Sequence, residues 1–262
     1  MKRILTLLIV LAALCAAMTA QADDSWEKVQ SSGQLVIGLD DAFPPMGFRT
    51  DDGQLVGFDI DAAEEVGRRL GIKIVWQPTA WKGVINSLNS NKFDAIWNGM
   101  TITEERAAQV LFTQPYMMDG QIAIVRMDEQ AIKAHEDLGD KNVGVQAGSP
   151  ALEAAKSLPM APAQIREYDD NPKAFLDLES GRLDSVVVDN LSGLYFTAAQ
   201  PGKFKALPGF ITKEPFGVAF RKADVSLRDK VQETIDAMVA DGTMGEISIK
   251  WFGEDITNPA NF

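Results

Sequence analysis

The sequence contains little of the chemistry that most enzymes use. Its 262 residues include one histidine, His135, and one cysteine, Cys15. A Ser-His or Cys-His nucleophile system could use only His135, and nothing around that residue suggests such a role. Zinc sites of the usual Cys/His type are absent, as are a phosphate-binding loop and a dinucleotide-binding glycine motif. We therefore expect no metal, no cofactor and no catalytic residues.

Positive charge is also scarce. The chain has 25 Lys and Arg against 37 Asp and Glu, a formal net charge of −12. Nucleic-acid binding needs cations opposite the phosphates, so we expect no nucleic-acid partner. Hydrophobic residues make up 46% and charged residues 24%, which is typical of a globular chain with one large domain or two smaller ones.

The one long hydrophobic run lies at the N-terminus. Lys2-Arg3 precedes the apolar stretch 4–18, and Ala20-Gln-Ala22 follows it. A basic start, a short apolar core and an A-x-A site predict a secretory signal peptide, residues 1–22, cleaved after Ala22. The rest of the chain has no cysteine, so its stability depends on its core. We expect a periplasmic protein without a lipid anchor at Cys15, because a leucine precedes that cysteine.

An internal repeat indicates two similar halves. Residues 88–98, Leu-Asn-Ser-Asn-Lys-Phe-Asp-Ala-Ile-Trp-Asn, align with 178–188, Leu-Glu-Ser-Gly-Arg-Leu-Asp-Ser-Val-Val-Val, at a constant offset of 90 residues. Leucine, serine, a basic residue, an apolar residue and aspartate recur in register. Each copy is typical of a helix end, a turn and a short buried strand. We therefore expect two similar α/β lobes.

Strand and helix patterns alternate along both halves. Strands are predicted at 34–39, 72–76, 143–146 and 165–168, and helices at 59–70, from about 151, and at 227–239. Asp59 is expected to cap the first helix and Gly71 to end it. The alternation implies a mostly parallel sheet in each lobe. Ligands bind beyond the carboxyl ends of such strands, which points to 40–43, 81, 98–106, 146–151 and 188–189.

The polar candidates at these positions have two interpretations each. In Thr101-Ile-Thr-Glu-Glu-Arg106, Thr103 can simply cap a helix with Arg106 on its solvated face. Alternatively, Arg106 lies in the cleft and binds a carboxylate. Gly148-Ser149 can be an ordinary cap or can present free N–H groups to an anion. The aromatic candidates Phe43 and Trp81 are by default interpreted as core residues.

Asp189 is a stronger candidate, because it ends the buried apolar run 186–188. A carboxylate in that position needs a cation or hydrogen-bond donors. The residue types and their order therefore indicate a binding site more than a catalytic one.

Several motifs occur in a fixed order along the chain. They are Gly53-Gln-Leu-Val-Gly-Phe-Asp-Ile-Asp61, Phe93-Asp94, Thr101–Arg106, Phe112-Thr-Gln-Pro-Tyr116, Val143-Gly-Val-Gln-Ala-Gly-Ser149, Phe216-Gly-Val-Ala-Phe220 and Lys250-Trp-Phe-Gly253. Together they resemble the bacterial extracellular solute-binding proteins of polar amino-acid ABC transporters. The resemblance covers essentially all of the chain after the signal peptide, and it implies the two-lobed type II periplasmic binding fold.

The resemblance implies how an amino acid is held by its charged end. Arg106 would bind the α-carboxylate, with Thr101 and the Ser149 segment beside it. Asp189 would pair with the α-ammonium, and the backbone carbonyl of Gly99 would also receive that group.

The resemblance also implies how the ligand side chain is enclosed. Phe43 and Trp81 would sandwich it. Asp40 stands where relatives read the far end of basic or amide side chains, and Gln146 and Asn98 add polar groups. We expect a polar uncharged or basic amino acid as ligand, although Asp40 can also simply cap the following turn.

The implied fold has two lobes joined by two crossings. The first lobe would combine 23–118 with 217–262, and the second would comprise 119–216, with hinge strands near 120–125 and 216–221. Closure around the ligand would present both lobes to a membrane permease. We expect a monomer that delivers its ligand to ABC permease subunits.

Two other functions on this fold stay open. A periplasmic cyclohexadienyl (arogenate) dehydratase would need an added general acid facing the ligand, and Glu153 or Glu179 would be the nearest candidates. A sensory input module is the third possibility, and the lack of a further spanning stretch after the signal peptide disfavours it. Because no acid/base constellation is evident, we expect binding rather than catalysis.

Overall fold

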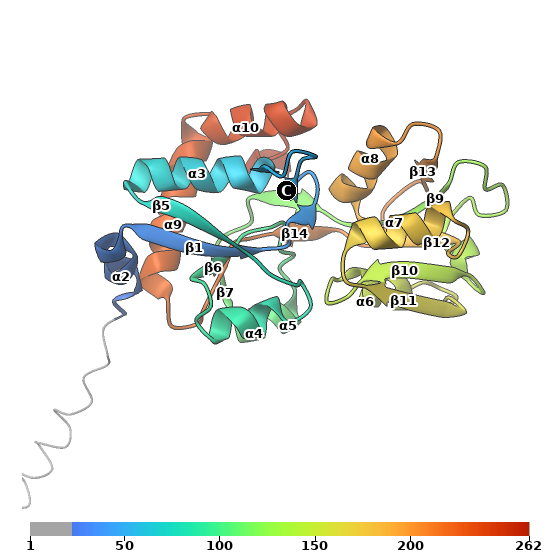
Figure 1. Cartoon of the computed structure of the whole chain (residues 1–262), viewed down its shortest axis with the longest axis horizontal. Coiled ribbons are helices and arrows are strands. Elements are labelled where there is room, and N and C mark those ends of the chain that lie inside the picture. Colours follow the sequence, from blue (N-terminus) through green and yellow to red (C-terminus); the bar gives the residue numbers. More distant parts are fainter. Residues whose placement is uncertain (1–22, 262) are drawn as a thin grey trace, which may run out of the picture.

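The computed structural model describes residues 23–261, so the predicted signal peptide at 1–22, Cys15 included, lies outside the described residues. The described chain forms two α/β lobes that lie side by side (Figure 1). Each lobe is built on a five-stranded sheet flanked by helices, which confirms the predicted fold class. Among residues 23–261, no helix is long and apolar enough to cross a membrane.

The sheet of the first lobe has the order β5-β1-β6-β15-β7. Four strands run in one direction, and only β15 is antiparallel to its neighbours. The strands are β1 (Gln34–Leu39), β5 (Lys73–Pro78), β6 (Ala95–Ile96), β7 (Leu111–Phe112) and β15 (Ala219–Phe220). The largest core lies between one face of this sheet and α2 (Ser25–Ser32), α3 (Phe58–Leu70), α9 (Val225–Ala240) and α10 (Thr243–Phe252). On the other face lie α4 (Val84–Asn89) and α5 (Glu104–Gln109).

The sheet of the second lobe repeats this order as β11-β10-β12-β9-β13. Again four strands share one direction and the fourth in the order, β9, is antiparallel. The strands are β9 (Gln121–Arg126), β10 (Asn142–Gln146), β11 (Gln164–Tyr168), β12 (Ser185–Asp189) and β13 (Phe204–Ala206). The helices are α6 (Ala151–Lys156) on one face, with α7 (Asn171–Glu179) and α8 (Asn190–Ala199) on the other; the short η1 (His135–Leu138) precedes β10.

The predicted repeat corresponds to equivalent places in the two sheets. The strands that end its two copies, β6 and β12, both lie in the middle of their sheets. Asp94 Oδ2 accepts from the backbone N–H of Val36 at 3.0 Å, and Asp184 Oδ2 accepts from that of Asn142 at 2.8 Å. The repeated aspartate therefore fixes the turn before the middle strand to the neighbouring strand in each lobe.

An arginine at the antiparallel strand completes each copy. Arg221, just after β15, donates from Nη1 to the carbonyl oxygens of Leu88 (3.3 Å) and Phe93 (2.6 Å). Arg126, at the end of β9, donates from Nη1 to those of Leu178 (3.1 Å) and Leu183 (2.6 Å). The repeated leucine and apolar positions are thus tied to the antiparallel strand by equivalent bonds.

The start of α3 differs from the prediction. The residue at the helix cap is Gly57, and Asp59 lies inside the first turn with its side chain fully buried. The Asp59 carboxylate accepts from Gly99 N (2.6 Å), Trp97 Nε1 (3.1 Å) and Tyr116 Oη (3.2 Å). The prediction that Asp59 caps this helix is wrong because those three donors attract the carboxylate inward. Burial raises the pKa of Asp59 to about 7, against the lowering effect of these bonds.

The connection between the lobes is also displaced from its predicted place. The sequence puts hinge strands near 120–125 and 216–221, but the linking pair is β8 (Met117–Asp119) with β14 (Glu214–Phe216). Of the predicted segments, 121–125 lie in β9 and 219–220 in β15, which belong to the two large sheets, while Phe216 belongs to β14. The apolar run 122–125 is buried in the second sheet, so the linking segment ends before it, at Asp119.

A small antiparallel sheet projects from the first lobe toward the second. It consists of β2 (Ala42–Phe43), β3 (Gly47–Arg49) and β4 (Leu55–Val56). Gly57 joins it to α3, and the backbone N–H of Asp59 donates to the Met46 carbonyl oxygen at 3.0 Å. This small sheet carries Phe43 and so bears directly on the site.

A substitution at Gly57 tests how much this junction contributes to the stability of the fold. Its φ is +148°, and a Cβ there would lie 2.1 Å from the Met46 carbonyl oxygen. We expect Gly57→Ala to lower the free energy of unfolding by about 3 kcal/mol, measured by urea denaturation. Gly53 has φ +83° but nothing within 4 Å of its Cβ position, so Gly53→Ala should cost about 1 kcal/mol. Equal losses would show that the close approach at Gly57 has no energetic weight.

Candidate functional site

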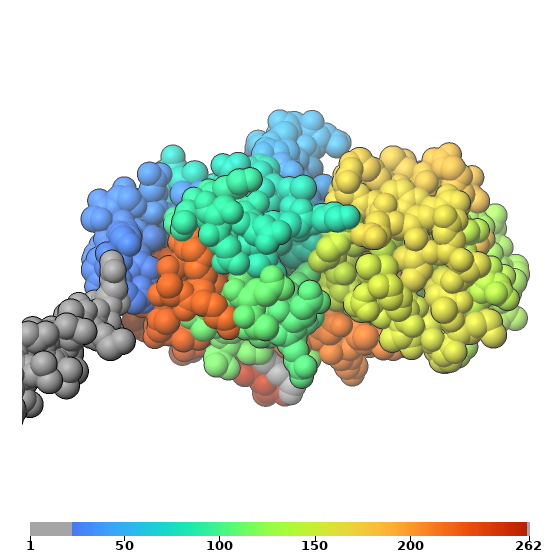
Figure 2. Space-filling model, turned by 90° about the horizontal axis from the view of Figure 1, so that it is seen from below, coloured from blue at the N-terminus to red at the C-terminus, as the bar shows by residue number. Residues whose placement is uncertain are grey.

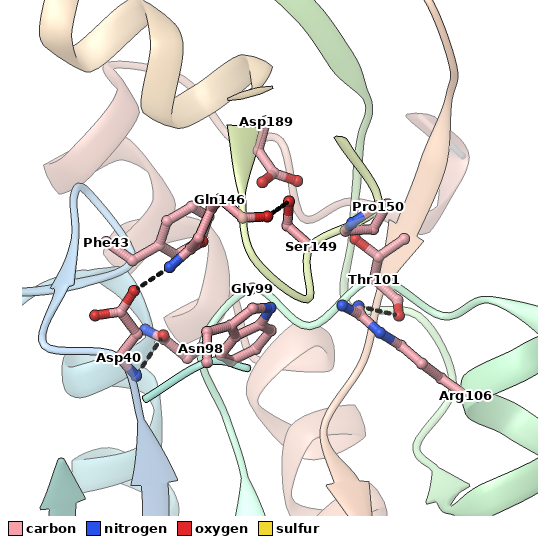
Figure 3. Close-up of a pocket in the computed structure, with 11 residues that line it drawn as sticks. Asp40, Phe43, Asn98, Gly99, Thr101, Arg106, Gln146, Ser149, Pro150 and Asp189 are labelled. Carbon is pink, nitrogen blue, oxygen red and sulfur yellow. Dashed lines mark hydrogen bonds between the residues drawn. The ribbon is translucent and has the colours of Figure 1, made fainter. Parts of the chain in front are cut away.

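One cavity between the lobes is lined by every site residue predicted from the sequence (Figure 3). The lining residues lie close together, and the space of about 250 Å³ among them includes open solvent at the mouth of the cavity. The lining residues are Asp40, Phe43, Trp81, Asn98, Gly99, Thr101, Arg106, Gln146, Ser149 and Asp189, with Pro150 in addition. Pro150 lies in the predicted segment 146–151 but was not named there as a site residue. The structure brings the ten together; their contact with a ligand stays a prediction.

The topology explains why these residues meet. Asp40 directly follows β1, and the segment 98–101 comes after β6, both at carboxyl ends in the first sheet. Gln146 ends β10 and Asp189 ends β12 in the second. Carboxyl ends of parallel strands gather on one edge of a sheet, and here the two edges face each other. A furrow runs between α5 and α6 on the face seen in Figure 2, and it adjoins the cavity.

The structure confirms the helix cap of one interpretation of Arg106 but not its solvated position. Thr103 caps α5, since its Oγ1 accepts from Arg106 N at 3.2 Å. The side chain nevertheless turns into the cavity and is only 8% exposed. Nη1 donates to the Thr101 carbonyl oxygen (2.9 Å) and Nη2 to that of Gly148 (3.0 Å), while Cζ lies 5.7 Å from the ring centroid of Trp81. Gly148 belongs to the second lobe, so this bond crosses the cleft.

The Arg106 charge lacks a direct counterion. Among residues 23–261, no carboxylate forms an ion pair with it; its two bonds go to neutral carbonyl groups. Burial lowers the pKa of the guanidinium, and the more distant charges of Asp189, Glu214 and Glu105 oppose that shift. An arginine stays protonated at neutral pH even so. A buried cation in this state is poised to accept an anionic group.

Asp189 provides the opposite charge from the other lobe. It is 5% exposed, and Gln121 Nε2 donates to its Oδ1 at 2.8 Å. The two residues are direct partners in the pairing of β12 with β9. Burial raises the pKa of Asp189 to about 6, with the Gln121 bond lowering it, Glu214 raising it and Arg106 lowering it. Asp189 is therefore ionised at neutral pH, and no cation among the described residues forms an ion pair with it.

The charged groups around the hinge were missed by the sequence analysis. Asp119 and Glu214 face each other in the β8–β14 pair. Asp119 is 5% exposed, and burial together with the Asp189 charge raises its pKa well above the usual range. Gln121 could have been found as the one polar residue that opens the apolar run 122–125. No local pattern in the sequence marked Glu214, because it comes near Asp189 only through the pairing of β14 with the distant strand β8.

The far end of the cavity is closed by a contact between the lobes. Gln146 Nε2 donates to Asp40 Oδ2 at 2.5 Å, while Ala42 N donates to Asp40 Oδ1 at 3.0 Å. Asn98 Oδ1 accepts from Asp40 N at 2.9 Å, and its buried Nδ2 has no partner among the described residues. Asp40 thus caps its turn and also lines the cavity. Burial raises its pKa to about 6, and the bonds from Ala42 and Gln146 oppose this.

The remaining predicted residues shape the wall. Gly99 has φ +56°, and a Cβ there would lie 2.8 Å from the Phe43 ring, so only glycine lets these residues approach so closely. Ser149 Oγ donates to the Gln146 carbonyl oxygen at 2.8 Å. Thr101 is 1% exposed and forms an isolated bridge to Phe216 beside the hinge.

The two acids considered for catalysis lie outside the cavity, although Glu153 lines the adjoining furrow. Glu153 has a side chain 72% exposed and pairs with Lys156 at 2.7 Å. Glu179 pairs with Lys203 at 2.6 Å, also on the surface. Neither lines the cavity. Among residues 23–261, no group of three or more His, Cys, Asp or Glu side chains could hold a metal ion.

Known proteins resemble the chain along almost its whole length. The L-cystine-binding protein TcyJ of Escherichia coli K12 is 35% identical over 249 residues, which cover 94% of this chain and 93% of that protein. The L-arginine-binding protein of Pseudomonas aeruginosa is 33% identical and covers 84% and 88%. A crystal structure of an ABC uptake transporter substrate-binding protein from Streptococcus pneumoniae with bound histidine has a TM-score of 0.85 at 33% identity, covering 91% and 99%.

All three are named as binding proteins, one of them as the substrate-binding protein of an ABC uptake transporter, and none is named as an enzyme, in agreement with the predicted absence of catalysis. The family of bacterial extracellular solute-binding proteins, family 3, matches residues 35–254. This chain therefore belongs to family 3 of the bacterial extracellular solute-binding proteins.

Proposed function

We propose that this protein captures a free amino acid with a polar or basic side chain between its lobes and delivers it to the permease of an ABC transporter. The observation that carries the proposal is a pair of buried opposite charges facing one cavity, Arg106 from the first lobe and Asp189 from the second. An amino-acid zwitterion supplies one group of each sign. Relatives named for cystine and arginine, and one solved with histidine, support this ligand class.

Each end of the ligand has its own set of groups in this proposal. Arg106, Thr101 and Ser149 hold the α-carboxylate, while Asp189 and the Gly99 carbonyl hold the α-ammonium. At the other end, Phe43 and Trp81 enclose the side chain, and Trp81 offers a face to a cationic group. Asp40, Gln146 and Asn98 supply hydrogen bonds at the tip. An acid there without a lysine disfavours glutamate and aspartate.

Transport follows from the two-lobed arrangement. A ligand held by Arg106 and Asp189 contacts both lobes only when they are closed, so it shifts the population toward the closed form. In this proposal the first lobe comprises 23–118 and 217–262, and the second comprises 119–216. The permease binds the protein with its two lobes closed. The protein acts as a monomer in the periplasm after cleavage behind Ala22, and it has no nucleic-acid partner.

A thermal-shift screen tests the proposal. The mature protein is refolded to remove bound ligand and is then heated with each amino acid and with prephenate. A ligand at a hundred times its Kd stabilises the fold by about 2.7 kcal/mol, so one or a few polar or basic amino acids should raise Tm. A flat response to all amino acids would contradict the proposal. Conversion of prephenate to product would favour the dehydratase instead.

Arg106→Ala should abolish amino-acid binding while leaving the fold intact. Removing one member of a buried charge pair costs roughly 2–5 kcal/mol, or about 30-fold to several thousand-fold in Kd. Titration calorimetry measures the loss, and circular dichroism with Tm checks the fold. Arg68 is exposed on α3 and pairs with Glu65 on the same helix, so Arg68→Ala serves as the matched control. Normal binding by Arg106→Ala would disprove the carboxylate assignment.

Asp189→Asn should weaken binding of amino acids strongly but matter less for ligands without the ammonium group. The asparagine keeps the shape and can still accept from Gln121, while the negative charge is lost. The measurement compares Kd for the best amino acid and for the corresponding carboxylic acid lacking the α-amine. An equal loss for both ligands would indicate a structural role for Asp189.

Affinity should fall as the pH drops from 7.5 to 5. Burial raises the pKa values of Asp40 and Asp189 to about 6, so both carboxylates lose their charge below that pH. For arginine or lysine both losses count; for glutamine the main loss is at Asp189. Asp40→Asn should therefore make the pH profile for a basic ligand resemble that for glutamine. Unchanged profiles for the basic ligands would place Asp40 outside the ligand contact.

The stability of the ligand-free protein should change with pH in the opposite direction. A carboxyl group whose pKa is raised on folding stabilises the fold when protonated, and this contribution is lost as the pH rises through about 6. Opposite trends for affinity and ligand-free stability in the same buffers separate the binding effect from acid unfolding.

A further inference from the structure

Helix α8 of the second lobe touches the first lobe outside the cavity. Leu191 packs against the core cluster of the first lobe. Tyr195, one turn further along, lies with its ring centroid 5.4 Å from that of Phe48 on β3. Residues four apart share one face of a helix, so this face of α8 is directed at the first lobe. Figure 1 shows α8 on the side of the second lobe that leans toward the small sheet.

The first lobe holds its side of this contact rigidly. Phe48 packs edge-on against Trp251 of α10, with 6.1 Å between ring centroids. Trp251 Nε1 in turn donates to Asp61 Oδ2 at 2.6 Å. We name Phe48, Tyr195 and Trp251 the aromatic clasp. None of the three lines the cavity.

The second lobe holds α8 equally firmly. Phe196, next to Tyr195, stacks on Phe175 with ring centroids 4.1 Å apart inside the core of that lobe. A Cβ at Gly193 would lie 3.0 Å from Val188 of β12, so the helix lies directly on the sheet. Tyr195 therefore moves with the second lobe, and Phe48 with the first.

The same helix connects the clasp to the site. Asp189 is the residue immediately before α8, and its carboxylate faces the cavity. Because α8 is fixed to its own sheet, a rotation of the second lobe as one body moves Asp189 and Tyr195 together.

We propose that the aromatic clasp is a closure contact that strengthens amino-acid binding without touching the ligand, with Tyr195 as its positioning residue. The inference rests on the proposed function. A contact made only between closed lobes adds to the stability of the closed form and so slows the opening that ligand release requires. It leaves the association rate nearly unchanged, as most affinity differences do.

The test compares Tyr195→Ala with the unaltered protein, using the amino acid that the screen identifies. Loss of the ring pair should raise Kd about tenfold, almost entirely through faster release. Release is followed by stopped-flow fluorescence, for which Trp81 at the cavity supplies a signal. The Tm of the ligand-free protein shows whether the fold itself has been weakened.

Three further variants separate the clasp from a structural effect. Leu194→Ala alters the neighbouring residue, which is 47% exposed, and should leave Kd and release unchanged. Tyr195→Phe keeps the ring and should retain near-normal affinity. Phe48→Ala should also speed release, and combining it with Tyr195→Ala should add little, because both changes break one contact.

The outcomes distinguish this inference from the proposed function. If the unaltered protein binds no amino acid, the proposed function fails. If it binds but Tyr195→Ala releases the ligand at the normal rate, the clasp is overturned and the function stands. Fully additive effects of Tyr195→Ala and Phe48→Ala, or a loss with Leu194→Ala as large as with Tyr195→Ala, would also overturn it.

Discussion

The structure depends on two buried charges of opposite sign that are kept apart. Among residues 23–261, the Arg106 guanidinium donates only to neutral carbonyl groups, and Asp189 accepts from the amide of Gln121. Burying each charge costs free energy, and this cost is not offset by an ion pair between the two side chains. Because they come from different lobes, a zwitterion that neutralises both also joins the lobes. In the proposed function, binding and closure are therefore driven by the same electrostatic imbalance.

The repeated architecture is what keeps the charges at the right places. Both lobes end their parallel strands at the cleft, and both fix the turn before the middle strand through an aspartate, Asp94 or Asp184. Arg221 and Arg126 then clamp that turn to the antiparallel strand. If the lobes move as rigid bodies in the proposed closure, small rotations at the β8–β14 pair open the whole cavity.

Local patterns in the sequence predicted the fold class and the residues that line one cavity. The alternation at 34–39 matches β1, and the rule for strand ends placed Asp40, Gln146 and Asp189 on one cavity. Long-range geometry escaped prediction. Asp59 looked like a helix cap, but donors from distant segments draw it inward. The hinge was displaced because an apolar run does not show where one sheet ends and a linker begins. Glu214 entered the site only through strand pairing.

Helix α8 shows how one element can serve both the ligand and the closure. Its first residue follows Asp189, its second packs on the opposite lobe, and its sixth, Tyr195, meets Phe48. The ligand charges act inside the cavity, while the aromatic contact acts outside it. Since the two are rigidly connected, affinity depends on the sum of both contributions. Selectivity, by contrast, depends only on groups that reach the ligand, so sequence changes in the clasp can alter affinity without altering which amino acid is bound.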